Sequence, residues 1–127
     1  MYPAQQTIVI VDDDPAIGRS LMRGLIAYGY RTEQFGSSAE CLNAIDTSEA
    51  ACFVIDVQLG LECGIDLARK LSDRGIKTPV IHMSGANSEN VRRAALASGS
   101  VAFLDKPFVM PELIRTIENA TGRKSTS

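Results

Sequence analysis

The stretch Cys52-Phe53-Val54-Ile55-Asp56 decides the fold, because it is an unbroken apolar run that ends in a carboxylate. A strand that is apolar on both faces is typical of the centre of a parallel sheet with helices on either side. Residues 57–64 follow with two glycines and neither a helical nor a strand period, so we expect a loop there. A carboxylate at the end of a buried strand is costly unless the protein uses it. Asp56 is therefore the first candidate functional residue.

Apolar runs and amphipathic helical patterns alternate along the rest of the chain. The predicted strands cover residues 7–11, 30–35, 52–55, 78–83 and 101–104, and a predicted helix follows each of them. Helix starts are indicated by Asp14 before Pro15, and by Ser37 three residues before Glu40, which is the spacing of a capping box. This alternation predicts an α/β fold with a five-stranded parallel sheet, doubly wound by helices on both faces. The common strand order is 2-1-3-4-5, which places the more polar second strand at an edge.

The composition limits the class of protein. A chain of 127 residues with 45% hydrophobic and 22% charged residues fits one soluble globular domain. A net charge of −2 gives no general attraction to nucleic acid or to an anionic membrane. No apolar run approaches the ~20 residues that span a bilayer, and the N-terminus lacks the features of a signal peptide. We therefore expect a cytoplasmic protein with no membrane partner, whose three cysteines are reduced thiols.

Polar side chains follow the carboxyl ends of the predicted strands. In open parallel sheets the functional site lies beyond those ends, at the point where the strand order reverses, which here falls between the first and third strands. The residues that follow the strand ends are Asp12, Asp13, Asp14, Asp56, Ser84 and Lys106. We expect these residues to converge at one edge of the sheet.

Clustered carboxylates indicate a cation site and a nucleophile. At an effective dielectric constant near ~20, two like charges ~4 Å apart repel by about 4 kcal/mol, a cost that a divalent cation relieves. Few acidic ligands, with room for water and phosphate, favour Mg²⁺ over Ca²⁺. The Asp56 carboxylate could attack phosphorus, Lys106 could neutralise charge and the Ser84 hydroxyl could donate a hydrogen bond to the transferred group. The pattern therefore predicts a phosphoryl-transfer site.

Four motifs in the chain resemble the receiver domain of two-component response regulators. They are Ile10-Val11-Asp12-Asp13-Asp14-Pro15, Val54-Ile55-Asp56, Met83-Ser84-Gly85 and Phe103-Leu104-Asp105-Lys106-Pro107-Phe108. The resemblance extends from Thr7 to about Ala120. It implies a flavodoxin-like receiver fold, with a receiver domain at residues 1–122 and a flexible tail or the start of a linker at 123–127. The Lys-Pro-Phe sequence resembles the FixJ-like and NarL-like subgroup, whose receivers precede a helix-turn-helix output domain.

The resemblance implies a phosphoacceptor and a metal site. Asp56 matches the residue that receives a phosphoryl group from a phosphohistidine on a sensor histidine kinase. The implied cofactor is Mg²⁺, and its implied ligands are Asp13, Asp56, the backbone carbonyl of Gln58 and, through water, Asp12.

The resemblance also implies a binding switch, and not an enzyme that acts on other molecules. Lys106 matches the lysine that pairs with the phosphoryl group, Ser84 the switch hydroxyl and Phe103 the switch aromatic residue. A new charge of about −1.5 to −2 would draw the hydroxyl inward, and the aromatic ring would follow. The face formed by the fourth helix, fifth strand and fifth helix would then change shape and bind a second copy or control a transcriptional output domain outside this chain. The domain itself is not expected to bind nucleic acid, and it would catalyse only its own phosphorylation and dephosphorylation.

Some residues depart from the family pattern or have a less certain role. The family often has Met-Pro where this chain has Leu59-Gly60, and glycine is expected to free the loop. His82 lies inside the fourth predicted strand, so we expect a packed strand residue. The helix near residues 91–97 has an alanine-rich face and is expected to be weakly anchored.

Three other interpretations stay open beside the switch. An aspartyl phosphatase would have Asp-x-Asp at the strand end, where this chain has Gln58, together with an insertion that encloses the substrate. A flavin- or nucleotide-binding module would need a glycine-rich phosphate loop after the first strand, where this chain has acids. A degenerate receiver that is never phosphorylated fits the fold, but the intact set of site residues argues against it.

Overall fold

Five parallel strands form the central sheet of this computed structural model, which describes residues 5–44, 49–86 and 88–124. The strand order is β2-β1-β3-β6-β7. The strands are β1 (Thr7–Val11), β2 (Arg31–Phe35), β3 (Ala50–Asp56), β6 (Val80–Ser84) and β7 (Ala102–Asp105). Because β6 and β7 are the fourth and fifth strands of this sheet, the predicted order 2-1-3-4-5 and the edge position of the second strand are confirmed.

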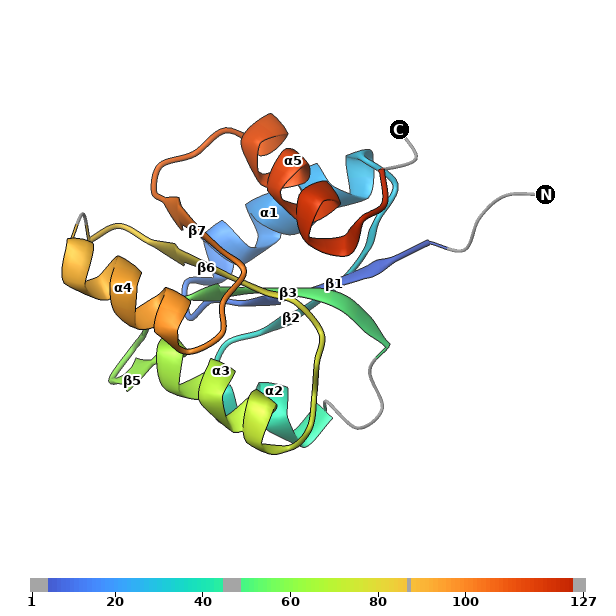
Figure 1. Cartoon of the computed structure of the whole chain (residues 1–127). Coiled ribbons are helices and arrows are strands. Elements are labelled where there is room, and N and C mark those ends of the chain that lie inside the picture. The colour runs from blue at the N-terminus through green and yellow to red at the C-terminus, as the bar shows by residue number, and fades with distance from the viewer. Residues whose placement is uncertain (1–4, 45–48, 87, 125–127) are drawn as a thin grey trace.

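Helices cover both faces of the sheet (Figure 1). The helices are α1 (Pro15–Ala27), α2 (Ser38–Ala44), α3 (Gly64–Asp73), α4 (Glu89–Ala97) and α5 (Met110–Thr121). Helices α1 and α5 lie on one face, and α2, α3 and α4 lie on the other. None of the helices in the described part of the chain is long and apolar enough to cross a membrane. Residues 125–127 of the predicted tail lie outside the described residues.

The expected caps position two of these helices. The Asp14 side chain accepts hydrogen bonds from the backbone N–H groups of the first turn of α1, and Pro15 occupies its first position. The Ser37 hydroxyl accepts from the Glu40 N–H at 3.2 Å. The Glu40 carboxylate accepts in return from the Gly36 N–H at 2.7 Å, one residue before the position that a capping box predicts. Both helices therefore start where the sequence indicated.

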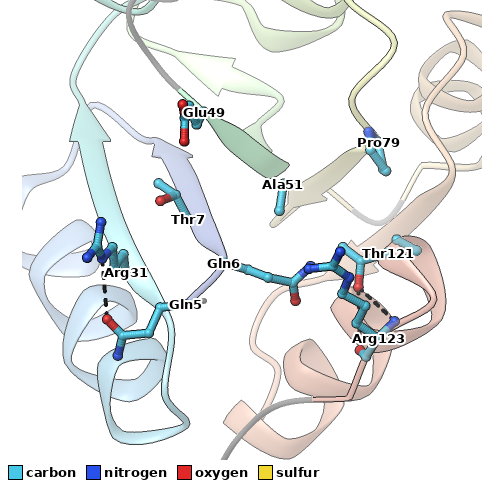
Figure 2. A pocket seen from close by; sticks show the side chains of 10 residues that line it. Gln5, Gln6, Thr7, Arg31, Glu49, Ala51, Pro79, Thr121 and Arg123 are labelled. Carbon is cyan, nitrogen blue, oxygen red and sulfur yellow. Dashed lines mark hydrogen bonds between the residues drawn. The ribbon is translucent and has the colours of Figure 1, made fainter. Parts of the chain in front are cut away.

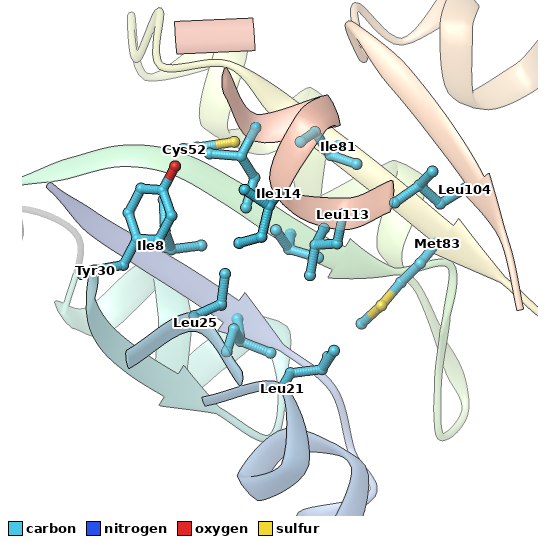
Figure 3. Close-up of a cluster of buried hydrophobic side chains, with 13 residues drawn as sticks. Ile8, Leu21, Leu25, Tyr30, Cys52, Ile81, Met83, Leu104, Leu113 and Ile114 are labelled. Atoms are coloured by element: carbon cyan, nitrogen blue, oxygen red, sulfur yellow. The ribbon is translucent and has the colours of Figure 1, made fainter. Parts of the chain in front are cut away.

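The core forms one cluster on one face of the sheet and two separate clusters on the other. Against α1 and α5, thirteen buried side chains form one continuous cluster, most of them labelled in Figure 3. The opposite face has two clusters, one beneath α2 and α3 and a smaller one of three buried residues, Ile65, Ala95 and Phe103, between α3, α4 and β7. The apolar run of β3 contributes to both faces, and residues 52–55 are fully buried as predicted.

The loop after β3 differs from the expectation. Residues 58–63 form a short antiparallel hairpin, with β4 at Gln58–Leu59 and β5 at Glu62–Cys63. Gly60 has a φ of +62°, a conformation that suits glycine at the first central position of a two-residue hairpin turn. Residues 58–63 therefore form a hairpin where we expected an irregular loop, and the effect of Gly60 on the freedom of this loop stays a prediction. Strands of two residues are too short to produce a periodic sequence signal.

Candidate functional site

Three carboxylates converge where the sequence placed them, beyond the carboxyl ends of β1 and β3. One carboxylate oxygen from each of Asp12, Asp13 and Asp56 lies within 4.8 Å of the others. Asp12 and Asp56 are buried and Asp13 is exposed, so the cluster opens to solvent on one side. The residues that line the hollow there, of about 380 Å³, are Asp12, Asp13, Asp14, Ile17, Asp56, Gln58, Gly60, Gly85 and Lys106.

Lys106 supplies the positive charge of the site. It follows β7, and its backbone N–H donates to the Ser84 carbonyl at 2.8 Å. The ammonium donates to Asp56 Oδ2 at 2.6 Å and lies 3.6 Å from Asp12 Oδ2. Burial by itself would lower the pKa of Lys106, but the hydrogen bond and charge of Asp56 and the charge of Asp12 together raise it above its usual value. The lysine therefore stays protonated between the two buried acids.

Asp12 has the chemistry of a cation ligand. Burial raises its pKa, although the Asp14 N–H that donates to Oδ1 at 2.9 Å and the charge of Lys106 both oppose this rise. Its Oδ2 atom is buried and accepts no hydrogen bond from any described residue. A buried carboxylate oxygen without a donor is costly. A hard divalent cation held by the three acids would remove this cost, so the residues fit such an ion.

Asp56 is fixed in position from several sides. Its Oδ1 accepts the Gln58 N–H at 3.0 Å, so each carboxylate oxygen has a partner. Behind it, Gly64 at the start of α3 lies against the Asp56 backbone, and a Cβ at Gly64 would be 2.0 Å from the Asp56 carbonyl oxygen. The Gly64 N–H also donates to the Val57 carbonyl at 2.6 Å. The hairpin and the start of α3 therefore hold the aspartate at the mouth of the hollow.

Ser84 and Phe103 lie near this centre without lining it. Ser84 ends β6, is 3% exposed, and its hydroxyl oxygen accepts the Ala86 N–H at 3.0 Å. Phe103 lies on β7 with an 8% exposed side chain, in register with His82 and two residues before Asp105, which pairs with Ser84. Both residues thus belong to the strand pair whose carboxyl end carries Lys106.

A family model described as the response regulator receiver domain matches residues 8–118. This chain belongs to the response regulator receiver domain family. It is 33% identical over 120 residues to the response regulator protein TodT of Pseudomonas putida, covering 94% of this chain and 53% of that protein. It is 31% identical over 120 residues to the response regulator protein TmoT of Ectopseudomonas mendocina, covering 94% of this chain and 54% of that protein. The receiver domain therefore spans about half the length of these curated relatives.

Solved receiver structures have the same fold. The receiver domain of the Francisella response regulator 1452 superimposes with a TM-score of 0.86 at 30% sequence identity, over 93% of this chain and 98% of that one. The structure titled FixJ-N superimposes with a TM-score of 0.87 at 28% identity, over 94% of this chain and 96% of that one. The predicted five-stranded, doubly wound receiver fold is therefore confirmed.

His82 supports this receiver site in a way that the sequence did not reveal. The residue is fully buried, as expected, and its Nε2 lies 3.0 Å from the Gly64 carbonyl oxygen. Burial lowers the pKa of His82, so the ring is neutral and Nε2 carries the proton that it donates to that carbonyl. The ring thereby holds the start of α3 against β6. A glycine just before a predicted helix was the available signal for the close contact at Gly64, but no local pattern indicates its histidine partner.

A larger hollow of the receiver domain lies at the opposite end of the sheet (Figure 2). It has a volume of about 530 Å³ and is bordered by the amino ends of the strands and the end of α5. Its lining includes two basic residues, Arg31 and Arg123, and one acidic residue, Glu49. The Arg31 side chain donates to the Gln5 side chain at 3.3 Å. Parallel sheets carry their sites at the carboxyl ends, so the smaller acidic hollow is the functional one.

Proposed function

We propose that this receiver domain is a phosphorylation-controlled switch in which Asp56 accepts a phosphoryl group. The observation that carries this proposal is the approach of Lys106 Nζ to 2.6 Å from Asp56 Oδ2, inside a cluster of three carboxylates. A structural ion pair would need one acid, whereas the additional acids repel each other and lower stability. This cost has an explanation if the cluster holds a cation and the aspartate is a nucleophile.

The expected donor is a phosphohistidine of a sensor histidine kinase. An oxygen of the Asp56 carboxylate attacks phosphorus, the bond between phosphorus and the donor imidazole nitrogen breaks, and the imidazole leaves with that electron pair. The product is an acyl phosphate on Asp56 and a histidine ready to take a proton. The contacts with Gln58 and Lys106 orient the carboxylate before the attack, which lowers the entropic part of the barrier.

Asp12, Asp13 and Asp56 would hold Mg²⁺, with the Gln58 carbonyl as a further ligand and Asp12 acting through water. When bound, the ion would supply charge neutralisation for the phosphoryl oxygens. Two observations support this assignment: Asp12 Oδ2 accepts no hydrogen bond from a described residue, and the carboxylate oxygens of the three acids lie within 4.8 Å of one another. Lys106 neutralises further charge, because its ammonium already lies between two of the acids.

The phosphoryl group would be read out through Ser84 and Phe103. Its charge of about −1.5 to −2 draws the Ser84 hydroxyl toward it, and the Phe103 ring follows. The α4–β7–α5 face then changes shape. Two exposed large hydrophobic side chains belong to the elements that form this face: Leu96 on α4 and Val109 at the N-cap of α5. Exposed apolar groups of this kind support docking of a second copy or of an output domain.

The wider role is also a proposal, because the relatives are about twice as long. The receiver domain would comprise residues 1–122, since Gly122 ends α5 in a left-handed conformation, and the following residues would begin a linker. The Lys-Pro-Phe sequence supports the FixJ-like and NarL-like subgroup and a transcriptional output. In this role the domain is a switch that turns over only its own phosphoryl group, and it leaves nucleic-acid binding to another domain.

Intact mass measurement tests the proposal directly. The protein is incubated with Mg²⁺ and a small-molecule phosphoryl donor, beside Asp56→Asn and a sample with the metal chelated. We expect one added phosphoryl group in the first sample and none in the other two. An unmodified protein, under conditions that label another receiver, would show that the domain is degenerate.

A further inference from the structure

Arg92 contacts the ring of Phe103 from outside the core. It lies on α4, and its guanidinium carbon is 5.7 Å from the centroid of that ring. A guanidinium at this distance over an aromatic face is attracted by the ring quadrupole. Within the described residues Arg92 has no carboxylate in ion-pair range, whereas its neighbour Arg93 pairs with Glu89 at 3.7 Å. The aromatic ring is therefore the partner that fixes the Arg92 side chain.

This contact lies at a junction with few other large side chains. Ala95 is the one fully buried residue of α4, and the cluster around it contains Phe103 and Ile65. Alanine buries little apolar area, so the ring of Phe103 is the main apolar contact between β7 and α4. The Arg92 side chain covers this ring on its solvent side, where Phe103 is 8% exposed. Removing the guanidinium would leave the ring free to turn outward.

We propose that Arg92 is a positioning residue that holds the Phe103 ring in its buried position and so ties α4 to β7. This inference rests on the proposed function, in which the ring reports the state of Asp56. Arg92 stabilises the buried position of the ring in the unphosphorylated domain. If phosphorylation favours the same ring position, thermodynamic linkage requires Arg92 to strengthen the phosphorylated state, by at most the same factor.

The size of the effect follows from the exposure of Arg92. A cation–π contact at an exposed site changes an equilibrium by about two- to fivefold. We therefore expect the ratio of buried to exposed Phe103 ring to fall about two- to fivefold in Arg92→Gln, which keeps a polar stem and loses the cation. Arg92→Lys retains a cation over the ring and should lose less.

Aromatic NMR on the full chain tests the ring position without phosphorylation. The phenylalanine rings are isotope-labelled, the Phe103 signal is assigned by its loss in Phe103→Leu, and its exposure is measured by broadening from a soluble paramagnetic agent. We expect stronger broadening of the Phe103 signal in Arg92→Gln than in the wild type. Arg93→Gln is the matched control, because it removes the same charge from the next position of α4. Unchanged broadening in Arg92→Gln, or equal broadening in Arg93→Gln, would overturn the inference.

Binding of beryllofluoride with Mg²⁺ then tests the coupling to Asp56. We expect the apparent affinity to weaken in Arg92→Gln, by at most about two- to fivefold, and to stay unchanged in Arg93→Gln. In a Phe103→Leu background, Arg92→Gln should add no further loss, because the ring on which it acts is absent. An Arg92→Gln effect that persists in that background would contradict action through Phe103. A wild-type protein that binds no beryllofluoride would refute the proposed function, while the ring measurement would still decide the role of Arg92.

Discussion

Gly64→Ala should destabilise the domain and displace Asp56, the proposed phosphoacceptor. The added Cβ would lie 2.0 Å from the Asp56 carbonyl oxygen, about 1.4 Å short of the 3.4 Å at which ordinary van der Waals contact begins. The obstructing atom belongs to the backbone of β3, so no flexible side chain can move aside. The start of α3 must therefore shift away from the strand.

The cost can be estimated from the contacts that such a shift loosens. Overpacking a well-filled site costs about 1–3 kcal/mol. The shift also weakens the 2.6 Å hydrogen bond from the Gly64 N–H to Val57 and the 3.0 Å bond from His82 to the Gly64 carbonyl. Each such bond contributes about 0.5–1.5 kcal/mol. Replacing glycine by alanine restricts the unfolded chain and returns about 0.4–1 kcal/mol. We therefore expect a net loss of about 2–4 kcal/mol in the free energy of unfolding.

Urea unfolding measures this loss, and Gly85→Ala is the matched control. Gly85 borders the same hollow, has no positive φ, and a Cβ there would meet nothing within 4 Å. We expect Gly85→Ala to leave the unfolding midpoint unchanged or slightly raised. If Gly64→Ala had the midpoint of the wild type with an unchanged m-value, the close contact at Asp56 would not constrain the fold, and the reasoning would be wrong.

Three further substitutions test other parts of the site. Burial holds the pKa of His82 below 6.5, so the unfolded chain takes up the proton first as the pH falls, and stability should decrease below about pH 6.5. The free energy of unfolding of His82→Met, measured in urea across this range, should lack that contribution. Parallel pH profiles of the two proteins would contradict this expectation. Gly60→Ala should lower the free energy of unfolding by about 1–2 kcal/mol, because an alanine is strained at a φ of +62°. Equal unfolding midpoints of the variant and the wild type would rule out the positive φ at Gly60. Asp13→Asn should raise the melting temperature in chelator, because it removes a like charge from the cluster. It should also reduce the stabilisation that added Mg²⁺ gives the wild type. If Mg²⁺ raised the melting temperature of both proteins equally, Asp13 would not be a ligand.

The sequence predicted the sheet and the acidic cluster because both depend on features that are local along the chain. Apolar runs, caps such as Asp14 and stop glycines define each strand–helix unit, and the order of parallel strands then brings Asp12 and Asp56 to one edge. Asp12 directly follows β1 and Asp56 is the last residue of β3, so each strand brings its acid to the site. Lys106 converged for the same reason, because it follows the last strand.

The contacts that the sequence did not predict join residues that no local pattern connects. His82 reaches Gly64 across eighteen positions, and this pairing depends on how α3 packs on β6. The contact of Arg92 with Phe103 similarly depends on the placement of α4 over β7. The hairpin at Gly60 was missed because each of its strands contains two residues. Whether Phe103 and Ser84 act as switch residues stays a prediction.

The division of the core into one cluster on one face and two on the other implies regions of different local stability. Thirteen buried side chains join α1 and α5 to the sheet, whereas α4 and β7 share a cluster of three. Sub-global opening exposes least apolar surface where the buried cluster is smallest, so the α4 corner should open at the lowest free energy. Its amide protons would exchange with solvent sooner than those of α1 and α5. The domain thus has one locally weak corner at α4, beside larger buried clusters on both faces of the sheet.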